Sequence, residues 1–160
     1  YQKGPCLPEI TVIFGSMYGN TEAAVAPLLD TIDRAGVKVH VHRVPRDHIG
    51  DILTSVWTSS GVVLGMPTYE YKMFPPMLAV LDELAKKKVQ NRLAFRFGSY
   101  GWSGGAQAEL DKVMAEYKTG WQFLEPVEFK GKPREADLER ICQRVNELAI
   151  RVKAAVTVAQ

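Results

Sequence analysis

Residues 9–22 read EITVIFGSMYGNTE, and their pattern indicates the fold class. Its first six residues are mostly apolar and β-branched, and they have the length of a buried strand. The turn at 15–21, GSMYGNT, leads into a helical pattern over 20–35, for which Asn20 can serve as the N-cap. A strand that passes through a short polar turn into a helix is the first half of a βαβ unit, so we expect the pattern to repeat.

The alternation of strand and helix continues along the rest of the chain. Alternation of this kind indicates a parallel sheet with right-handed crossovers. Five strands and five helices complete a doubly wound α/β domain, for which the expected strand order is 2-1-3-4-5. The expected strands are residues 9–14, 37–44, 61–65, 91–99 and 121–129, and the expected helices are residues 20–35, 48–57, 75–87, 104–117 and 134–155.

Length and composition restrict the class of protein. The chain has 160 residues, 46% hydrophobic and 24% charged, which is typical of one globular domain. A net charge of +2 is too small to indicate nucleic acid or an anionic membrane as a partner. No apolar run reaches the roughly 18 residues that a membrane span needs. We expect an arm or linker at residues 1–8, one domain at 9–156, and a cytoplasmic location.

The turn at residues 15–21 has the chemistry of a phosphate site. Ser16 and Thr21 offer hydroxyl groups, Gly19 allows tight backbone closure, and the helix start adds free N–H groups. The GxxxxGK[ST] and GxGxxG patterns are both absent, which disfavours a nucleoside triphosphate or a dinucleotide. From these residues alone, a polar capping turn without a ligand stays an alternative.

Two later loops follow strand ends at the same edge of the predicted sheet. They read GMPTYEY at 65–71 and GSYGWSGG at 98–105. Each combines aromatic residues with small or polar ones, as a planar heteroaromatic ring requires for stacking and for bonds to its polar edge. The alternative is that these aromatics only cover the core. Convergence of three loops at one edge favours the ring.

At this point the sequence resembles a known family. SMYGNTE is similar to the flavodoxin phosphate pattern (T/S)-x-(T/Y)-G-x-T, although SMYG alone also fits WrbA-like NAD(P)H:quinone oxidoreductases. PTYEYKMFPPM and SYGWSGGA resemble the isoalloxazine loops in the flavodoxin-like domain of flavodiiron proteins. The resemblance covers about residues 9–155. The uninterrupted segment WQFLEPVEF at 121–129 resembles the short-chain form of flavodoxin.

The resemblance implies non-covalently bound FMN, held by three groups of residues. The first group would bind the phosphate, and the other two would line the two sides of the ring. The implied phosphate residues are Ser16, Met17, Tyr18, Gly19, Asn20 and Thr21; the implied ring residues are Pro67, Thr68, Tyr69 and Glu70 on one side and Ser99, Tyr100, Gly101, Trp102, Ser103 and Gly104 on the other.

The resemblance also implies an electron-transfer role. In flavodiiron proteins, FMN delivers electrons to a diiron centre that reduces O₂ or NO, and the centre lies in a metallo-β-lactamase-like domain. The implied electron donor is rubredoxin or a flavin or NAD(P)H reductase. Alternatives are a free-standing FMN-dependent quinone oxidoreductase, a stand-alone flavodoxin, or a scaffold domain without cofactor. No catalytic residue is assigned to this chain.

Two features depart from the family pattern. Free-standing flavodoxins are usually strongly acidic, whereas this chain is close to neutral. The HxHxDH iron motif of the diiron domain is represented only by His40-Val41-His42, with no Asp-His after it. The two histidines lie on one side of the expected strand, but no third ligand is evident nearby. We therefore expect surface or packing histidines and no metal site here.

Overall fold

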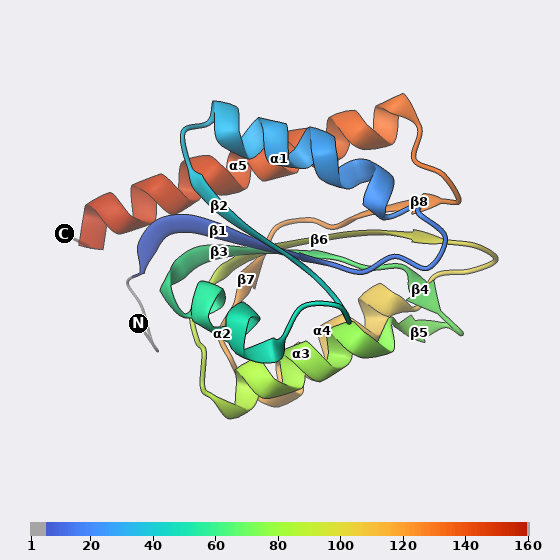
Figure 1. The fold of residues 1–160 in the computed structure, drawn as a ribbon, viewed down its shortest axis with the longest axis horizontal. Helices are drawn as coiled ribbons and strands as arrows, with labels where there is room; N and C mark the ends of the chain where they lie inside the picture. Colours follow the sequence, from blue (N-terminus) through green and yellow to red (C-terminus); the bar gives the residue numbers. More distant parts are fainter. Residues whose placement is uncertain (1–5, 160) are drawn as a thin grey trace.

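The computed structural model describes residues 6–159 of the chain. A central sheet lies between two layers of helices (Figure 1). The strands of this sheet are β1 (Leu7–Phe14), β2 (Lys38–Arg43), β3 (Ser59–Gly65), β6 (Leu93–Tyr100), β7 (Gln122–Phe123) and β8 (Val127–Lys130). The first strand thus begins two residues before the expected start, and residues 1–5 of the expected arm lie outside the described residues.

All strands of the central sheet run parallel, in the order β2-β1-β3-β6-β7, with β8 also paired to β6. The predicted order 2-1-3-4-5 is confirmed, because β6 takes the fourth place and β7 with β8 the fifth. Phe14 is in register with Gly65, and Gly65 with Phe97. The ends of β1 and β3 are therefore level with one another and with Phe97, three residues before the end of β6, and the three following loops meet at one edge.

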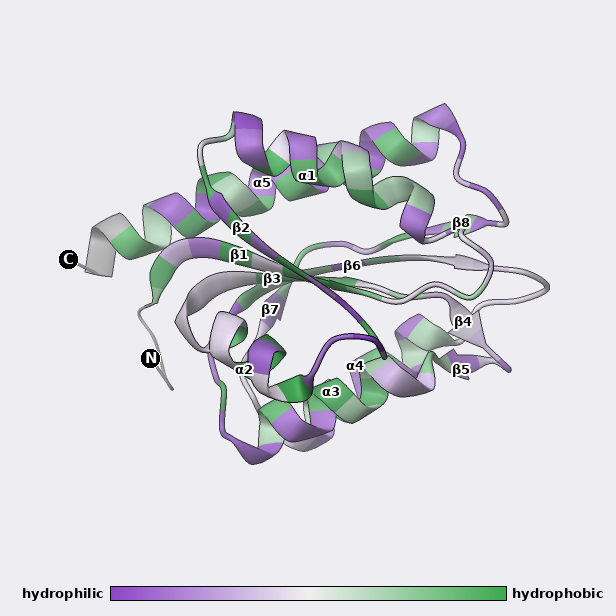
Figure 2. Cartoon of the chain, in the orientation of Figure 1, coloured by the Kyte–Doolittle hydropathy of each residue, from purple (hydrophilic) through white to green (hydrophobic). Residues whose placement is uncertain are grey.

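The helices cover both faces of the sheet, α1 and α5 on one and α2, α3 and α4 on the other (Figure 1). Each face has its own apolar core. Val12, Phe95 and Phe97 belong to the first core, and Ile13, Val62 and Leu64 belong to the second, as strand alternation requires. Figure 2 shows hydrophobic and hydrophilic stretches alternating along each helix, the pattern of helices with one buried face. The helices are α1 (Val25–Arg34), α2 (Ile49–Thr58), α3 (Pro75–Lys86), α4 (Ala106–Tyr117) and α5 (Glu135–Ala159).

The prediction of one uninterrupted strand at 121–129 is wrong. Leu124 still donates its N–H to the carbonyl oxygen of Ala94, at 2.8 Å, but the ladder breaks after it. Pro126 has no N–H to donate, so the chain cannot continue to pair there and resumes at Val127. Only three residues separate β7 from β8, and both segments lie beside β6.

Two other local features differ from the expectation. The first helix begins as a short 3-10 turn, η1 (Glu22–Ala24), whose preceding residue Thr21 already has helical backbone angles. Within the described residues, the Asn20 side chain accepts no backbone N–H at the start of this turn, so the expected N-cap is not formed. The loop after β3 contains an unexpected antiparallel hairpin, β4 (Thr68–Tyr69) and β5 (Lys72–Met73). Among the helices of residues 6–159, none combines the length and apolarity of a membrane span.

Candidate functional site

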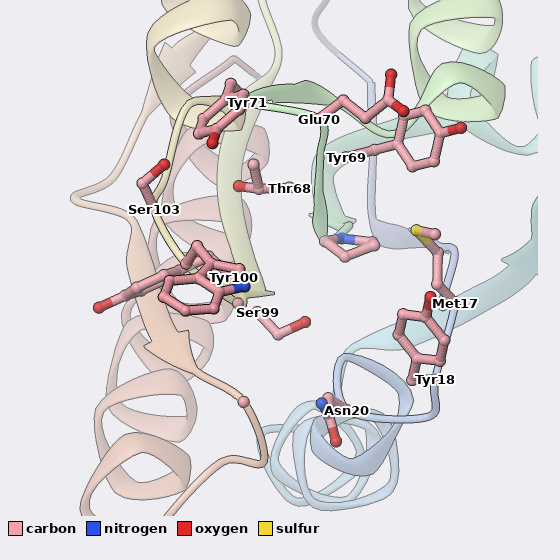
Figure 3. A pocket seen from close by; sticks show the side chains of 14 residues that line it. Met17, Tyr18, Asn20, Thr68, Tyr69, Glu70, Tyr71, Ser99, Tyr100 and Ser103 are labelled. Atoms are coloured by element: carbon pink, nitrogen blue, oxygen red, sulfur yellow. The ribbon is translucent and has the colours of Figure 1, made fainter.

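A cavity of about 460 Å³ opens where β1, β3 and β6 end. Aromatic side chains surround it, and several are largely exposed: Tyr18 at 85%, Tyr71 at 70% and Trp102 at 96%. Figure 3 shows Tyr100 and Ser103 on one side and Tyr69, Met17 and Tyr18 on the other, with Thr68 and Ser99 between them. The cavity is lined by Met17, Tyr18, Asn20, Pro67, Thr68, Tyr69, Glu70, Tyr71, Ser99, Tyr100, Gly101, Trp102, Ser103 and Gly131.

The turn after β1 is closed by its own serine. The Ser16 hydroxyl oxygen accepts a hydrogen bond from the Gly19 N–H at 2.9 Å, which bends the chain back on itself. Within the described part of the chain, the backbone N–H groups of Met17, Tyr18, Asn20 and Thr21 donate to no protein group. Unpaired N–H groups at the start of a helix bind anions favourably. The turn thus offers several donors to one phosphate group.

A buried pair of hydroxyls joins the first turn to the third loop. Thr21 Oγ1 lies 3.2 Å from Ser99 Oγ, and it also accepts the Ser99 N–H at 3.3 Å. Thr21 is 1% exposed and Ser99 is 7% exposed. Since a buried hydrogen bond is costly to break, this contact fixes the distance between the phosphate-type turn and the loop after β6.

The second and third loops pack backbone against backbone, and glycine makes this possible. A Cβ on Gly98 would overlap the carbonyl oxygen of Met66, and one on Gly105 would overlap the carbonyl oxygen of Tyr71. The Met66 N–H donates to the Phe97 carbonyl oxygen at 3.0 Å, which continues the β3–β6 ladder into the loops. The two walls of the cavity therefore form one unit.

A buried ion pair lies beneath these loops. Arg96 of β6 has a fully buried side chain, and its Nη1 is 3.0 Å from Glu128 Oε2 of β8. Burial holds the pKa of the Arg96 guanidinium below its usual value, and the nearby Glu128 carboxylate opposes that shift. The guanidinium still stays charged at neutral pH. The sequence did not indicate this pair, because Arg96 and Glu128 occupy separate strands with no shared motif.

Most of the residues predicted for the site lie at the cavity. Four of them do not line it, namely Ser16, Gly19, Thr21 and Gly104. The first three form the turn after β1, and Gly104 lies next to the Glu128 carboxylate. The sequence missed Tyr71 and Gly131, which both line the cavity. The other predicted residues all line it, namely Met17, Tyr18, Asn20, Pro67, Thr68, Tyr69, Glu70, Ser99, Tyr100, Gly101, Trp102 and Ser103.

The two histidines of β2 have local partners. His40 Nε2 is 2.8 Å from the Glu9 carboxylate, and His42 Nε2 is 2.7 Å from the Ser55 hydroxyl. Burial lowers the pKa of His42, and the nearby Asp47 carboxylate opposes the change. Within residues 6–159, no group of three or more His, Cys, Asp and Glu side chains is placed to hold a metal ion.

This parallel sheet, with a phosphate-type turn after β1 and aromatic loops after β3 and β6, defines a flavodoxin-type domain. Residues 12–144 match the model of the family described as Flavodoxin. The chain belongs to the flavodoxin family, whose cofactor is FMN. The cavity fits that cofactor, because a set of unpaired N–H groups adjoins a space between aromatic walls.

Three known proteins illustrate the range of its relatives. The anaerobic nitric oxide reductase flavorubredoxin of Pectobacterium atrosepticum is 33% identical over 145 residues, which cover 88% of this chain and 28% of that protein. The flavodiiron core of a Synechocystis protein superposes with a TM-score of 0.84 at 26% identity, covering 92% of this chain and 36% of the other. A flavodoxin from the domain Archaea superposes with a TM-score of 0.78 at 29% identity, covering 91% and 99%. The chain thus spans under a third of the flavorubredoxin and nearly all of the archaeal flavodoxin.

Proposed function

We propose that this chain is the FMN-binding electron-transfer part of a flavodiiron protein and delivers electrons to a diiron centre that reduces O₂ or NO. The observation that carries the proposal is the cavity formed by three loops at one edge of the sheet. The names of the matched relatives, flavorubredoxin and flavodiiron core, support the wider setting. The chain's coverage of 28% of the flavorubredoxin leaves ample length for a diiron domain in such a parent protein.

In this proposal, different residues of the site bind the phosphate and the ring of FMN. The unpaired N–H groups of Met17, Tyr18, Asn20 and Thr21, together with the Ser16 hydroxyl, hold the phosphate. The loops at 67–71 and 99–103 hold the ring between their aromatic side chains and supply donors and acceptors to its edge. FMN, when bound, supplies one- and two-electron transfer.

The open side of the cavity is where a redox partner would approach. Tyr18, Tyr71 and Trp102 are exposed around it, and exposed aromatic side chains are characteristic of protein interfaces. The partners that we propose are a diiron domain of the metallo-β-lactamase-like type as acceptor, and rubredoxin or a flavin or NAD(P)H reductase as donor. We propose that the protein functions in the cytoplasm.

A second candidate is a stand-alone flavodoxin. It is supported by the archaeal flavodoxin, which the chain covers to 99% of its length. The same fold and cavity would then carry electrons between separate proteins. The two candidates share the FMN site and differ only in the partner.

One experiment separates the two candidates. The FMN-loaded chain is reduced chemically without O₂ and mixed with NO, with and without an isolated diiron domain of a flavorubredoxin. We expect the flavin absorbance to return at least tenfold faster with the diiron domain, because FMN alone supplies no metal pair to bind NO. Equal rates in the two mixtures would contradict the flavodiiron assignment and favour the stand-alone carrier.

A further inference from the structure

The Arg96–Glu128 pair joins three segments that build the cavity. Arg96 Nη2 donates to the carbonyl oxygen of Met66, at 2.9 Å, immediately before the loop that begins with Pro67. Its Nη1 is 3.0 Å from Glu128 and 3.5 Å from the side-chain oxygen of Gln107, in the first turn of α4. The guanidinium therefore ties the end of β3, the start of α4 and β8 together.

Glu128 extends the pair towards the third loop. A Cβ built on Gly104 would lie 3.6 Å from Glu128 Oε2, so the carboxylate lies directly against the loop that follows Trp102 and Ser103. Its side chain is 28% exposed, whereas that of Arg96 is fully buried. The positive charge is thus enclosed in protein, and so is the Glu128 Oε2 that faces it, while the rest of the Glu128 side chain reaches solvent.

Burial of the Arg96 guanidinium costs more desolvation free energy than a purely structural contact requires. Transfer of a guanidinium from water to a protein interior carries a large desolvation cost, and hydrophobic residues of similar size often serve stability as well or better. The Arg96 Nε–H is buried too and donates to no group within the described residues. A charge that is enclosed in a region of low dielectric also acts over a longer distance than a surface charge.

We propose that Arg96 is a positioning residue of the FMN site and that its ion pair with Glu128 sets the reduction potential of the bound cofactor. The inference rests on the proposed FMN site. The hydrogen bond from Arg96 to the Met66 carbonyl oxygen holds the loop after β3 against the loop after β6. The enclosed positive charge of Arg96 favours reduced FMN, because reduced FMN carries more negative charge than oxidised FMN. Glu128 moderates that effect, so the two side chains shift the potential in opposite directions.

The test is a measurement of FMN affinity and midpoint potential in three variants. In Glu128→Gln we expect reduced FMN to gain about tenfold in affinity relative to oxidised FMN, which is about +30 mV for a two-electron couple. In Arg96→Met we expect a shift of similar size in the opposite direction, with weaker binding of oxidised FMN. The double variant buries no charge, so we expect it to fold and to have a potential near that of the unaltered chain.

Arg92 provides the matched control. It is also buried, at 1% exposure, and immediately precedes β6, but it donates to carbonyl oxygens of α2 at the far end of the sheet. Arg92→Met should therefore lower stability and leave the potential unchanged. If Arg96→Met does not fold, the double variant should still have a lower potential than Glu128→Gln, because the two variants differ only at position 96 and the double variant lacks the Arg96 charge.

The outcomes are distinct. Opposite shifts in the two single variants, or the lower potential of the double variant, support the proposal. Shifts in the same direction, shifts below twofold in relative affinity, or an equal shift in Arg92→Met would overturn it. Failure of the unaltered chain to bind FMN would contradict the proposed function itself, and this is measured first.

Discussion

At the amino edge of the sheet, the Arg92 guanidinium donates to the carbonyl oxygens of Val56 and Trp57, in the last turn of α2, and to that of Gln90. At the carboxyl edge, the N–H groups of residues 17, 18, 20 and 21 have no protein partner within the described chain. Helix ends leave carbonyls unpaired on one side and N–H groups on the other. The protein supplies its own cation at one edge, whereas at the other it leaves the anion to a ligand.

The amino edge thus serves stability, and the carboxyl edge serves binding. The amino edge is closed by buried bonds such as that of Ser59 Oγ to Thr11 Oγ1, at 2.7 Å. The carboxyl edge exposes Tyr18, Tyr71 and Trp102 around a cavity. Substitutions at the amino edge should therefore lower stability without affecting FMN, and those on the cavity surface should do the reverse.

Gly98→Ala should have the largest effect, because it forces apart the two loops that form the cavity walls. The added Cβ overlaps the Met66 carbonyl oxygen, and a backbone group cannot rotate away as a side chain can. We expect a loss of about 3 kcal/mol in the free energy of unfolding and at least tenfold weaker FMN binding. Urea unfolding and FMN titration measure the two effects.

The control for this change is Gly101→Ala, three residues further along. Nothing lies within 4 Å of a Cβ at that position. Unfolding free energy should stay within about 0.5 kcal/mol of the original value. Equal destabilisation by the two substitutions would show that the loops are not held together as described.

Arg92→Met should separate stability from binding at the opposite edge. It leaves buried carbonyl oxygens of α2 without a donor, and we expect a loss of about 2 kcal/mol in the free energy of unfolding. The dissociation constant for FMN should change by less than twofold. A tenfold loss of FMN affinity in the folded variant would contradict the conclusion that the amino edge affects stability and not FMN binding.

Ser16→Ala and Thr21→Ala test the phosphate end of the cavity. Each should weaken FMN binding by about 1–3 kcal/mol, the scale of a hydrogen bond to a charged group. Thr21→Ala should also lower the unfolding free energy, because its hydroxyl bonds to Ser99 in the interior. Inorganic phosphate should compete with FMN for the unaltered chain.

Thr31 carries a hydroxyl that serves as a control for these two. It bonds to the Pro27 carbonyl oxygen within α1, away from the turn. Thr31→Ala should leave FMN affinity unchanged. Unaltered affinity in both Ser16→Ala and Thr21→Ala would mean that the phosphate binds elsewhere.

Trp102→Ala should give the smallest effect, confined to the cofactor. Trp102 is 96% exposed, so its removal should cost little stability, but it lines the cavity and should change the flavin absorption and weaken binding by about 1 kcal/mol. Trp121→Ala is the counterpart, because the Trp121 indole N–H bonds to the Val89 carbonyl oxygen and its ring packs near Phe123. Similar absorption changes in the two variants would remove Trp102 from the site.

The sequence predicted the three loops because parallel topology brings strand ends to one edge, whatever the side chains do. It missed contacts that depend on distant register. Gly131 reaches the cavity because its N–H bonds to the Tyr100 carbonyl oxygen, which follows from the pairing of β8 with β6. Tyr71 was missed because its turn lacks the Asn-Gly signal of a hairpin. The break at Pro126 could have been predicted from the sequence, because proline has no N–H to donate to the ladder.

We propose that the cavity binds FMN through both its phosphate and its ring. The direct measurement is titration of the cofactor-free chain with FMN, riboflavin and FAD, followed by flavin fluorescence. We predict that the protein quenches the fluorescence of FMN and that the titration ends at one equivalent. Riboflavin, which lacks the phosphate, should bind at least tenfold more weakly. FAD should also bind at least tenfold more weakly, because its pyrophosphate is too large for the turn at residues 16–21. Equal affinity for FMN and riboflavin would contradict a phosphate site at residues 16–21, and no quenching of FMN fluorescence would contradict FMN binding in the cavity.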